Sequence, residues 1–239
     1  MSNRTTIQTT LNEFVQANMH SSALFEQLGL DTCCGGQKTL EEACAEKGLD
    51  PHQVLEKWYA GFASAEEPST PIQPEGDTLT EWVDYIVDTH HRYLKEALPR
   101  LTELIEKVVR AHSANHSELN EIQKIFSELR AELEPHLQKE EQVLFPMIRQ
   151  LDVESGLPQF HCGSIRNPIR VMLMEHEQTE ELLNSLSETS QGYRVPEDGC
   201  ETYHSLYKEL ENLEKDTRAH IAKENDRLFP RVLERELNT

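Results

Sequence analysis

His136-Leu-Gln-Lys-Glu140-Glu-Gln-Val-Leu-Phe-Pro146 is followed, 84 residues later, by a second version of itself, His220-Ile-Ala-Lys-Glu224-Asn-Asp-Arg-Leu-Phe-Pro230. Both copies keep His at the first position, Lys-Glu at the fourth and fifth, and Leu-Phe-Pro at the end. Because residues i and i+4 share one face of a helix, each copy directs an imidazole and a carboxylate to the same point. A single copy is equally compatible with an amphipathic helix whose His and Glu face solvent. The repetition of the ligand-type positions favours a metal site of two such pairs that face each other and hold two ions.

Two histidines upstream extend the repeat. His91 and His176 lie 85 residues apart, close to the spacing of the two long copies. Each half of the chain therefore offers one His, a connection, and then the His-x-x-x-Glu pattern. The expected ligands are His91, His136 and Glu140 from the first half and His176, His220 and Glu224 from the second.

His90 competes with His91 for the first of these positions. Adjacent residues point about 100° apart on a helix, so only one of the two is expected to face the ions. The half-repeat favours His91, as does the row of apolar residues Val87, Leu94 and Leu98 at helical spacing from it. The remaining histidines have no repeat partner and are expected on the surface or in loops.

The composition limits the partners. With 43 acidic and 23 basic residues among 239, the formal charge is -20, which is opposite to what a nucleic acid or an anionic membrane surface attracts. No apolar run is long enough to span a bilayer, and the first residues lead into no apolar signal segment. Five cysteines without framework spacing indicate reduced thiols. We therefore expect a soluble, cytoplasmic protein that binds neither nucleic acid nor membrane.

Three regions follow from the order of patterns along the chain. Residues 1–65 read as a small helical module, and residues 66–77, rich in proline, as a linker. Residues 78–239 read as four long helices in an up-down-up-down bundle, an all-α fold with kinks expected at the prolines. The long helices are expected at about 78–110, 118–151, 168–190 and 200–237, with prolines at 99, 135 and 146.

The small module carries a pair of adjacent thiols, Cys33 and Cys34, followed by two glycines. This places two sulfurs in a flexible turn, where thiolates can bind soft or borderline metal ions. Adjacent cysteines rarely form a relaxed disulfide with each other. A module of this size has a thin core, so it is expected to pack on the bundle or on a second copy of itself, which leaves a homodimer open.

Four imidazoles and two carboxylates suit iron, with manganese or zinc as alternatives. With these residues the chain resembles the iron–sulphur cluster repair di-iron proteins of the ScdA/YtfE family, also called repair-of-iron-centres proteins, whose bundle is hemerythrin-like. The resemblance rests on Cys-Cys-Gly-Gly followed by Thr39-Leu40, on the run from Lys139 to Ile148, and on the closing His220 segment. It covers nearly the whole chain; Pro135 before His136 and the His90-His91 pair are departures.

The resemblance implies two non-haem iron ions bridged by the glutamates and by an oxo group. It implies a stress-response role in which iron–sulphur clusters damaged by nitric oxide or peroxide are restored by supplying iron. Proteins with damaged clusters would be the partners, and Cys33 and Cys34 would take part in the transfer. Nitric oxide or dioxygen would be small ligands of the centre.

Three functions compete with this interpretation. An enzyme that reduces nitric oxide at the di-iron centre would need an electron source, and the sequence shows no flavin or haem motif. A protein that stores or senses dioxygen or nitric oxide would have no use for the thiol module. A purely structural bundle would not need the repeated ligands. The sequence therefore favours cluster repair, with nitric oxide binding or reduction as the alternative.

Overall fold

The computed structural model describes residues 5–17, 21–30, 32, 35–63, 74, 78–153, 160 and 163–237. These residues form helices, and their only β-type pairings are two isolated bridges, so the all-α prediction is confirmed. None of the described helices combines the length and the apolar character needed to cross a membrane. The described chain divides into two compact units, a small one built mainly from N-terminal residues and a larger helical bundle. Except for Pro74, the predicted linker lies outside the described residues.

The small unit contains four short helices: α1 (Leu11–Ala17), α2 (Ser21–Gln27), α3 (Leu40–Lys47) and α4 (Pro51–Ala63). Thr39 starts α3 with a capping box, in which the Glu42 amide donates to the Thr39 hydroxyl and the Glu42 carboxylate accepts from the Thr39 amide. The core centres on Phe14, whose ring meets those of Phe25 and Trp58 edge to face at 5.5 and 5.1 Å. Such pairs add to the stabilisation from burial, which a unit of this size needs.

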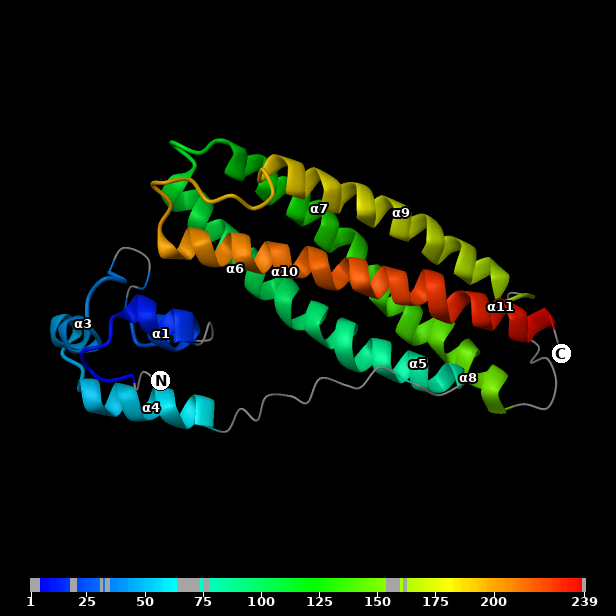
Figure 1. The fold of residues 1–239 in the computed structure, drawn as a ribbon, viewed down its shortest axis with the longest axis horizontal. Helices are drawn as coiled ribbons and strands as arrows, with labels where there is room; N and C mark the ends of the chain where they lie inside the picture. The colour runs from blue at the N-terminus through cyan, green and yellow to red at the C-terminus, as the bar shows by residue number, and fades with distance from the viewer. Residues whose placement is uncertain are drawn as a thin grey trace. The chain divides into compact units, whose positions relative to one another are not determined.

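The bundle consists of four rods that run beside one another (Figure 1). Each begins and ends close to where the sequence predicts, and three of them contain a five-residue π-helical segment. In chain order the rods are α5 (Leu79–Ile86), η1 (Val87–His91) and α6 (Arg92–His112); α7 (Glu118–Lys139), η2 (Glu140–Leu144) and α8 (Phe145–Val153); α9 (Arg166–Thr189); and α10 (Glu201–Lys223), η3 (Glu224–Leu228) and α11 (Phe229–Leu237).

The helical backbone continues through two of the prolines at which kinks were expected. Pro99 lies inside α6 and Pro135 inside α7, each within a continuous helix. The irregular turns are instead the three π-helical segments, of which η2 and η3 end immediately before α8 and α11. At Pro146, where a kink was also expected, a π-helical turn ends just before the proline.

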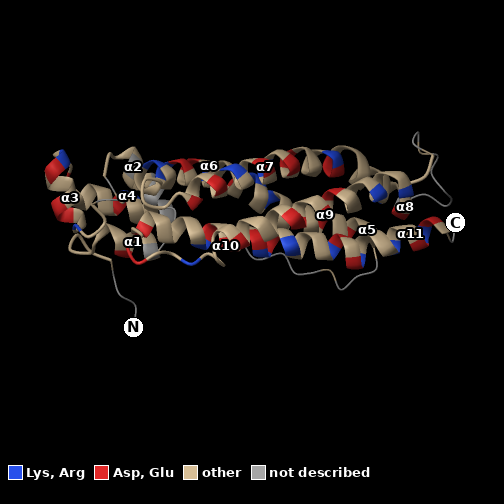
Figure 2. Ribbon diagram, turned by 90° about the horizontal axis from the view of Figure 1, so that it is seen from above, with Lys and Arg blue, Asp and Glu red and all other residues tan. Residues whose placement is uncertain are grey.

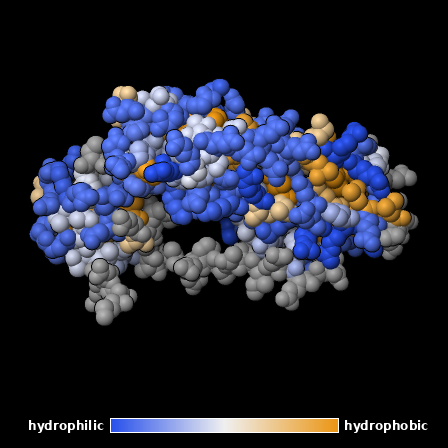
Figure 3. Space-filling model, turned by 45° about the horizontal axis from the view of Figure 1, so that its top comes forward, coloured by the Kyte–Doolittle hydropathy of each residue, from blue (hydrophilic) through white to orange (hydrophobic). Residues whose placement is uncertain are grey.

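Side-chain burial separates the two sides of each rod. At the end of the bundle formed by α5, α8, α11 and the start of α9, the apolar side chains form one core that includes Trp82, Phe145 and Phe229. Acidic and basic residues are interspersed along the bundle helices (Figure 2). Most of the face in Figure 3 is hydrophilic, with a hydrophobic strip on one part. Exposed apolar residues of α9 are Val171, Leu173 and Met174.

Candidate metal centre

All six predicted ligand residues lie in the interior of the bundle, and none is more than 3% exposed. His91 ends the π-helical segment η1, and Glu140 and Glu224 begin η2 and η3. His136 and His220 lie one turn earlier, in the last turns of α7 and α10, and His176 lies in the middle of α9. The i, i+4 spacing works as predicted, because the Nε2 atoms of His136 and His220 lie 3.4 and 3.2 Å from the carboxylates of their own helices.

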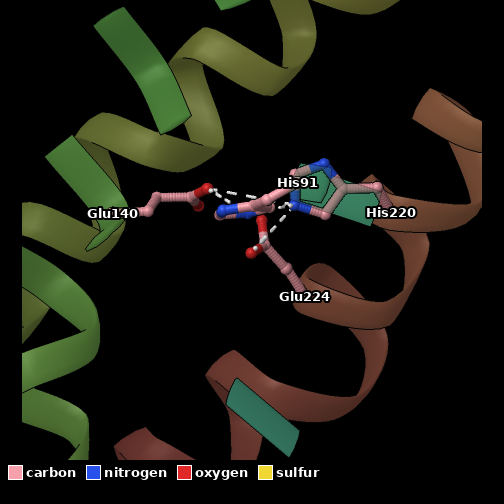
Figure 4. Close-up of side chains that lie close together, drawn as sticks. All are labelled: His91, Glu140, His220 and Glu224. Atoms are coloured by element: carbon pink, nitrogen blue, oxygen red, sulfur yellow. Dashed lines mark hydrogen bonds and ion pairs between the residues drawn. The ribbon is translucent and has the colours of Figure 1, made fainter. Parts of the chain in front are cut away.

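The six residues form two groups of four that share both glutamates. One group contains His91 and His220, and the other contains His136 and His176; within each group the ligand atoms lie within 4.8 Å of one another. Figure 4 shows the first group, with its imidazoles and carboxylates pointing toward one another. Glu140 approaches His91 at 3.3 Å and His136 at 3.4 Å, so it connects the two groups. Glu224 likewise approaches His176 at 3.1 Å and His220 at 3.2 Å.

The half-repeat predicts the six ligands but leaves open how they divide between two ions. In the structure each group takes one histidine from each half. The reason lies in the packing of the rods. α7 packs along α9, and α6 is tied to α10 by an ion pair between Arg100 and Glu209 at 2.8 Å. Each group is therefore formed between helices of opposite halves.

The π-helical segments lie at the ligands themselves. The Phe145 amide donates to the Glu140 carbonyl five residues back, and the Phe229 amide donates to the Glu224 carbonyl in the same way. Pro146 and Pro230 follow directly; a proline has no N–H and its ring crowds the carbonyl four residues earlier, so a wider turn relieves the clash. Single π turns inside α-helices are frequent at functional sites.

Three of the four histidines are oriented by a hydrogen bond at Nδ1, which leaves Nε2 facing the other ligands. The Nδ1 partner of His91 is Glu141 (2.8 Å), and that of His136 is Glu175 (2.9 Å). The amide oxygen of Asn225 lies 2.8 Å from Nδ1 of His176. Partners of this kind fix the tautomer and the ring orientation of metal-binding histidines.

The phenylalanines of the two Leu-Phe-Pro copies pack on ligand histidines. Phe145 stacks on His91 with 5.4 Å between ring centroids, and Phe229 stacks on His176 at 6.0 Å. Both phenylalanines are 2% exposed. The repeated Phe therefore covers one side of the centre with hydrocarbon and limits the rotation of an imidazole.

Burial controls the protonation of the ligand residues. Burial lowers the pKa of His91 and of His136 to about 4, so both imidazoles are neutral at neutral pH and keep a lone pair at a ring nitrogen. Burial, and then the facing charge of Glu224, raises the pKa of the Glu140 carboxyl well above its usual value. A cation between the two glutamates would supply the positive charge that allows both to ionise.

The carboxylate oxygens provide a direct test of whether a metal ion fits. All four oxygens of Glu140 and Glu224 are buried and accept no well-formed hydrogen bond from any described residue. Buried carboxylates without partners are costly, and proteins normally pair them or use them to coordinate a metal. Neutral imidazoles and carboxylates form a donor set that suits divalent first-row metals. The residues present therefore fit a metal ion.

His90 occupies a different position from its neighbour. It belongs to neither group of four, but it is also buried, with 3% exposure, and its ring stacks on that of His220 at 5.5 Å. Its Nδ1 atom lies 2.9 Å from the carboxylate of Asp216. Of the two adjacent histidines, only His91 meets the other ligand residues, and His90 is buried beside them without joining either group.

Sequence reasoning missed the residues that orient the ligands. Glu141 and Asn225 each follow a ligand glutamate, and Glu175 precedes His176. Their places next to repeated positions were a usable signal. The predicted thiols Cys33 and Cys34 lie outside the described residues.

The fold and the site define a hemerythrin-like bundle with a cation-binding centre. Residues 83–232 match the family described as the hemerythrin HHE cation-binding domain, and residues 7–59 match ScdA_N, a domain of unknown function (DUF542). The chain is 36% identical over 225 residues to "Iron-sulfur cluster repair protein YtfE" of Escherichia coli O8 (strain IAI1), which covers 93% of this chain and 96% of that protein. Proteins of the same name from Shigella boydii serotype 4 (strain Sb227) and Escherichia coli strain K12 / DH10B match with the same identity and coverage. The chain therefore belongs to the ScdA/YtfE family of iron–sulfur cluster repair proteins.

Proposed function

We propose that this chain is a di-iron protein that restores iron–sulfur clusters damaged by nitrosative or oxidative stress, and that it does so by supplying iron. The observation that carries the proposal is the pair of buried four-residue groups that share Glu140 and Glu224, whose four oxygens receive no well-formed hydrogen bond from the described residues and face ligand imidazoles at 3.1–3.4 Å. The name of the relatives, iron-sulfur cluster repair protein, supports the role in repair.

In this proposal two non-haem iron ions occupy the two groups. His91 and His220 would hold one ion, His136 and His176 would hold the other, and Glu140 and Glu224 would be shared by both. The oxo bridge that the family resemblance implies belongs to the same proposal. When bound, such a centre exchanges between ferrous and ferric states and binds small ligands. A thiolate-free set of imidazoles and carboxylates suits iron better than a structural zinc, which is more often bound by cysteines.

The other residues of the centre have supporting roles. Glu141, Glu175 and Asn225 keep the Nε2 atoms of three histidines directed at the ions. Phe145 and Phe229 exclude water from one side of the imidazoles that they cover. These contacts hold the centre while it is loaded, and repair requires that iron can still leave it.

Cys33 and Cys34 are proposed to receive ferrous iron or to pass it on, because thiolates bind this ion. The clients would be proteins whose clusters have been damaged. A cytoplasmic location, where thiols stay reduced, fits this use of the cysteines.

Nitric oxide binding or reduction at the same centre is the second candidate. Each group offers four protein donor atoms, and iron in proteins commonly takes more ligands than that. A position for a small ligand such as nitric oxide or dioxygen is therefore expected. Reduction of nitric oxide would in addition require an external electron donor.

The experiment that tests the proposal uses the full chain, loaded with iron under anaerobic conditions. Iron content should reach two ions per chain, and the oxidised protein should show the near-ultraviolet absorption of an oxo-bridged pair. The loaded protein is then mixed with an enzyme whose [4Fe–4S] cluster has been destroyed by nitric oxide, and the recovery of that enzyme is followed. The metal-free protein plus a chelator serves as the control. Recovery no faster than in this control would refute iron supply, and nitric oxide consumption with a reductant would then favour the second candidate.

A further inference from the structure

The two halves of the repeat are offset by 84 or 85 residues, and the same offset pairs the residues that lie next to the ligands. For one such pair, Glu141 and Asn225, the two residues also have the same role. Glu141 and Asn225 each follow one of the two shared glutamates. The side-chain oxygen of each accepts a hydrogen bond from Nδ1 of a histidine on another rod. The partners are His91 and His176, both at 2.8 Å. These two histidines are equivalent in the repeat, and the structure treats them alike.

The relation fails for the other two histidines. Glu175 precedes His176 and is the Nδ1 partner of His136 at 2.9 Å. The residue that corresponds to Glu175 in the first half is His90, which precedes His91 and should serve His220. His90 instead lies with its ring nearly parallel to that of His220, at 15° and 5.5 Å between centroids.

As a result, His220 is the one ligand histidine that is held without a hydrogen bond at Nδ1. Its Nδ1 atom is buried and has no partner among the described residues. The stacked neighbour, His90, uses its own Nδ1 for Asp216 at 2.9 Å and presents a ring face to His220. Stacking restricts the ring of His220, but it neither fixes the tautomer nor makes Nε2 more basic, as a hydrogen bond to a carboxylate does.

Asp216, the hydrogen-bond partner of His90, is partly exposed to solvent. The Asp216 side chain is 22% exposed, and it lines an open surface hollow together with Tyr93, Asn212, Lys215 and Ala219. Two polar side chains, Asp216 and His90, thus connect this hollow with the ring of His220. A carboxylate at the outer end of this path is a suitable contact for a cation that enters or leaves.

We propose that the two ion positions are unequal and that the ion held by His91 and His220 is the one released first. The inference rests on the proposed function, in which ferrous iron is the cargo, and it adds which position supplies that iron. Loss of a hydrogen-bond partner of a ligand histidine typically costs roughly 10- to 100-fold in metal affinity. The position with His136 and His176, whose histidines both have such partners, retains its ion for longer.

The test measures iron release from the full chain without any client. The protein is loaded anaerobically with two ferrous ions per chain and mixed with an excess of a chelator whose ferrous complex is coloured. We expect two phases of equal amplitude, with rates that differ roughly 10- to 100-fold. The substitutions His90→Gln and His90→Glu put an acceptor where the repeat has Glu175, and either should slow the fast phase toward the slow one.

A second pair of variants assigns the slow phase. Asn225→Ala removes the partner of His176 and should accelerate only the slow phase, roughly tenfold or more. Asn225→Asp keeps an acceptor at the same place and should leave both phases close to wild type. Cobalt(II) in place of iron gives a second readout, because the loss of its visible absorption follows ion release without relying on the colour of a chelator complex.

Several results would overturn the proposal. Release in a single phase from the wild-type protein would mean that the two positions are equivalent. If the fast phase accelerates in Asn225→Ala, the ion released first is the one held by His136 and His176, contrary to the proposal. If the His90 variants do not fold, as judged by circular dichroism, the wild-type and Asn225 measurements decide alone. The release assay contains no client, so its outcome is independent of the cluster-recovery assay. Two-phase release without cluster recovery would refute iron supply but not the inequality of the two positions. Cluster recovery with single-phase release would refute the inequality but not iron supply.

Discussion

Replacing Glu140 by Leu should make the metal-free bundle more stable while removing its iron. Glu140 is fully buried, its oxygens accept no hydrogen bond from the described residues, and its neighbour across the centre is another carboxylate. Replacing buried ionic groups by apolar residues of similar volume often stabilises a protein by about 1–4 kcal/mol. For a domain of this size, 1 kcal/mol corresponds to about 2–4 °C in Tm, so a gain of about 2 kcal/mol should raise the Tm of the metal-free protein by about 4–8 °C.

Iron should reverse this order. Glu140 contacts histidines of both groups, His91 at 3.3 Å and His136 at 3.4 Å, so its loss weakens both ion positions. Free ligand at about 100 times its Kd stabilises a folded protein by about 2.7 kcal/mol per site. The wild-type protein should gain at least this amount on loading, whereas Glu140→Leu should gain almost nothing.

The assay is calorimetry of both proteins with and without iron, together with the iron content per chain. Glu132→Leu is the matched control, because Glu132 is an exposed glutamate on the same rod and its replacement should alter neither iron content nor the response to iron. The reasoning is refuted if Glu140→Leu still binds two ions. It is also refuted if the metal-free variant, with its helical content intact, melts well below the wild-type protein.

Three further predictions concern other parts of the chain. Phe145→Ala leaves a cavity beside a ligand imidazole in the bundle core, and we expect a loss of about 3–5 kcal/mol in urea unfolding together with a lower iron content. Gly36→Ala would place a methyl group against the Asn12 side chain, so limited proteolysis should cut the N-terminal unit faster and leave the bundle intact. The double substitution Cys33→Ala and Cys34→Ala should leave the iron absorption unchanged and slow the repair of damaged clusters. A double variant that repairs at the wild-type rate would remove the thiols from the mechanism.

The helices and the six residues that meet at the centre could be predicted because both depend on local spacing. The i, i+4 geometry of a helix is the same in every bundle, so His136 and Glu140 were bound to share a face once their segment was helical. The repeat identified which of the many acidic residues mattered. The histidines on the other two rods followed from the same spacing, and Leu94 and Leu98, which are buried, marked the inward face beside His91.

The grouping of the ligands could not be predicted in this way. A repeat states which positions are equivalent, but it does not state which rods are neighbours in space. That depends on long-range packing, such as the contact of α7 with α9, which brings His136 to His176. The repeat therefore gave the six ligands but not their division between the two groups.

The π-helical segments and the role of His90 show a second reason why a repeat is an incomplete guide. Pro146 and Pro230 occupy equivalent places and end equivalent wide turns, but η1 has no proline within the next turn and no counterpart in α9. Duplication makes two halves similar, whereas releasing one ion before the other requires them to differ. The informative positions are then those where the two halves disagree. His90 and Glu175 occupy equivalent positions, but only Glu175 accepts a hydrogen bond from a ligand histidine. We expect this difference to matter most for release, and it appears in the sequence as a position where the two halves carry different residues.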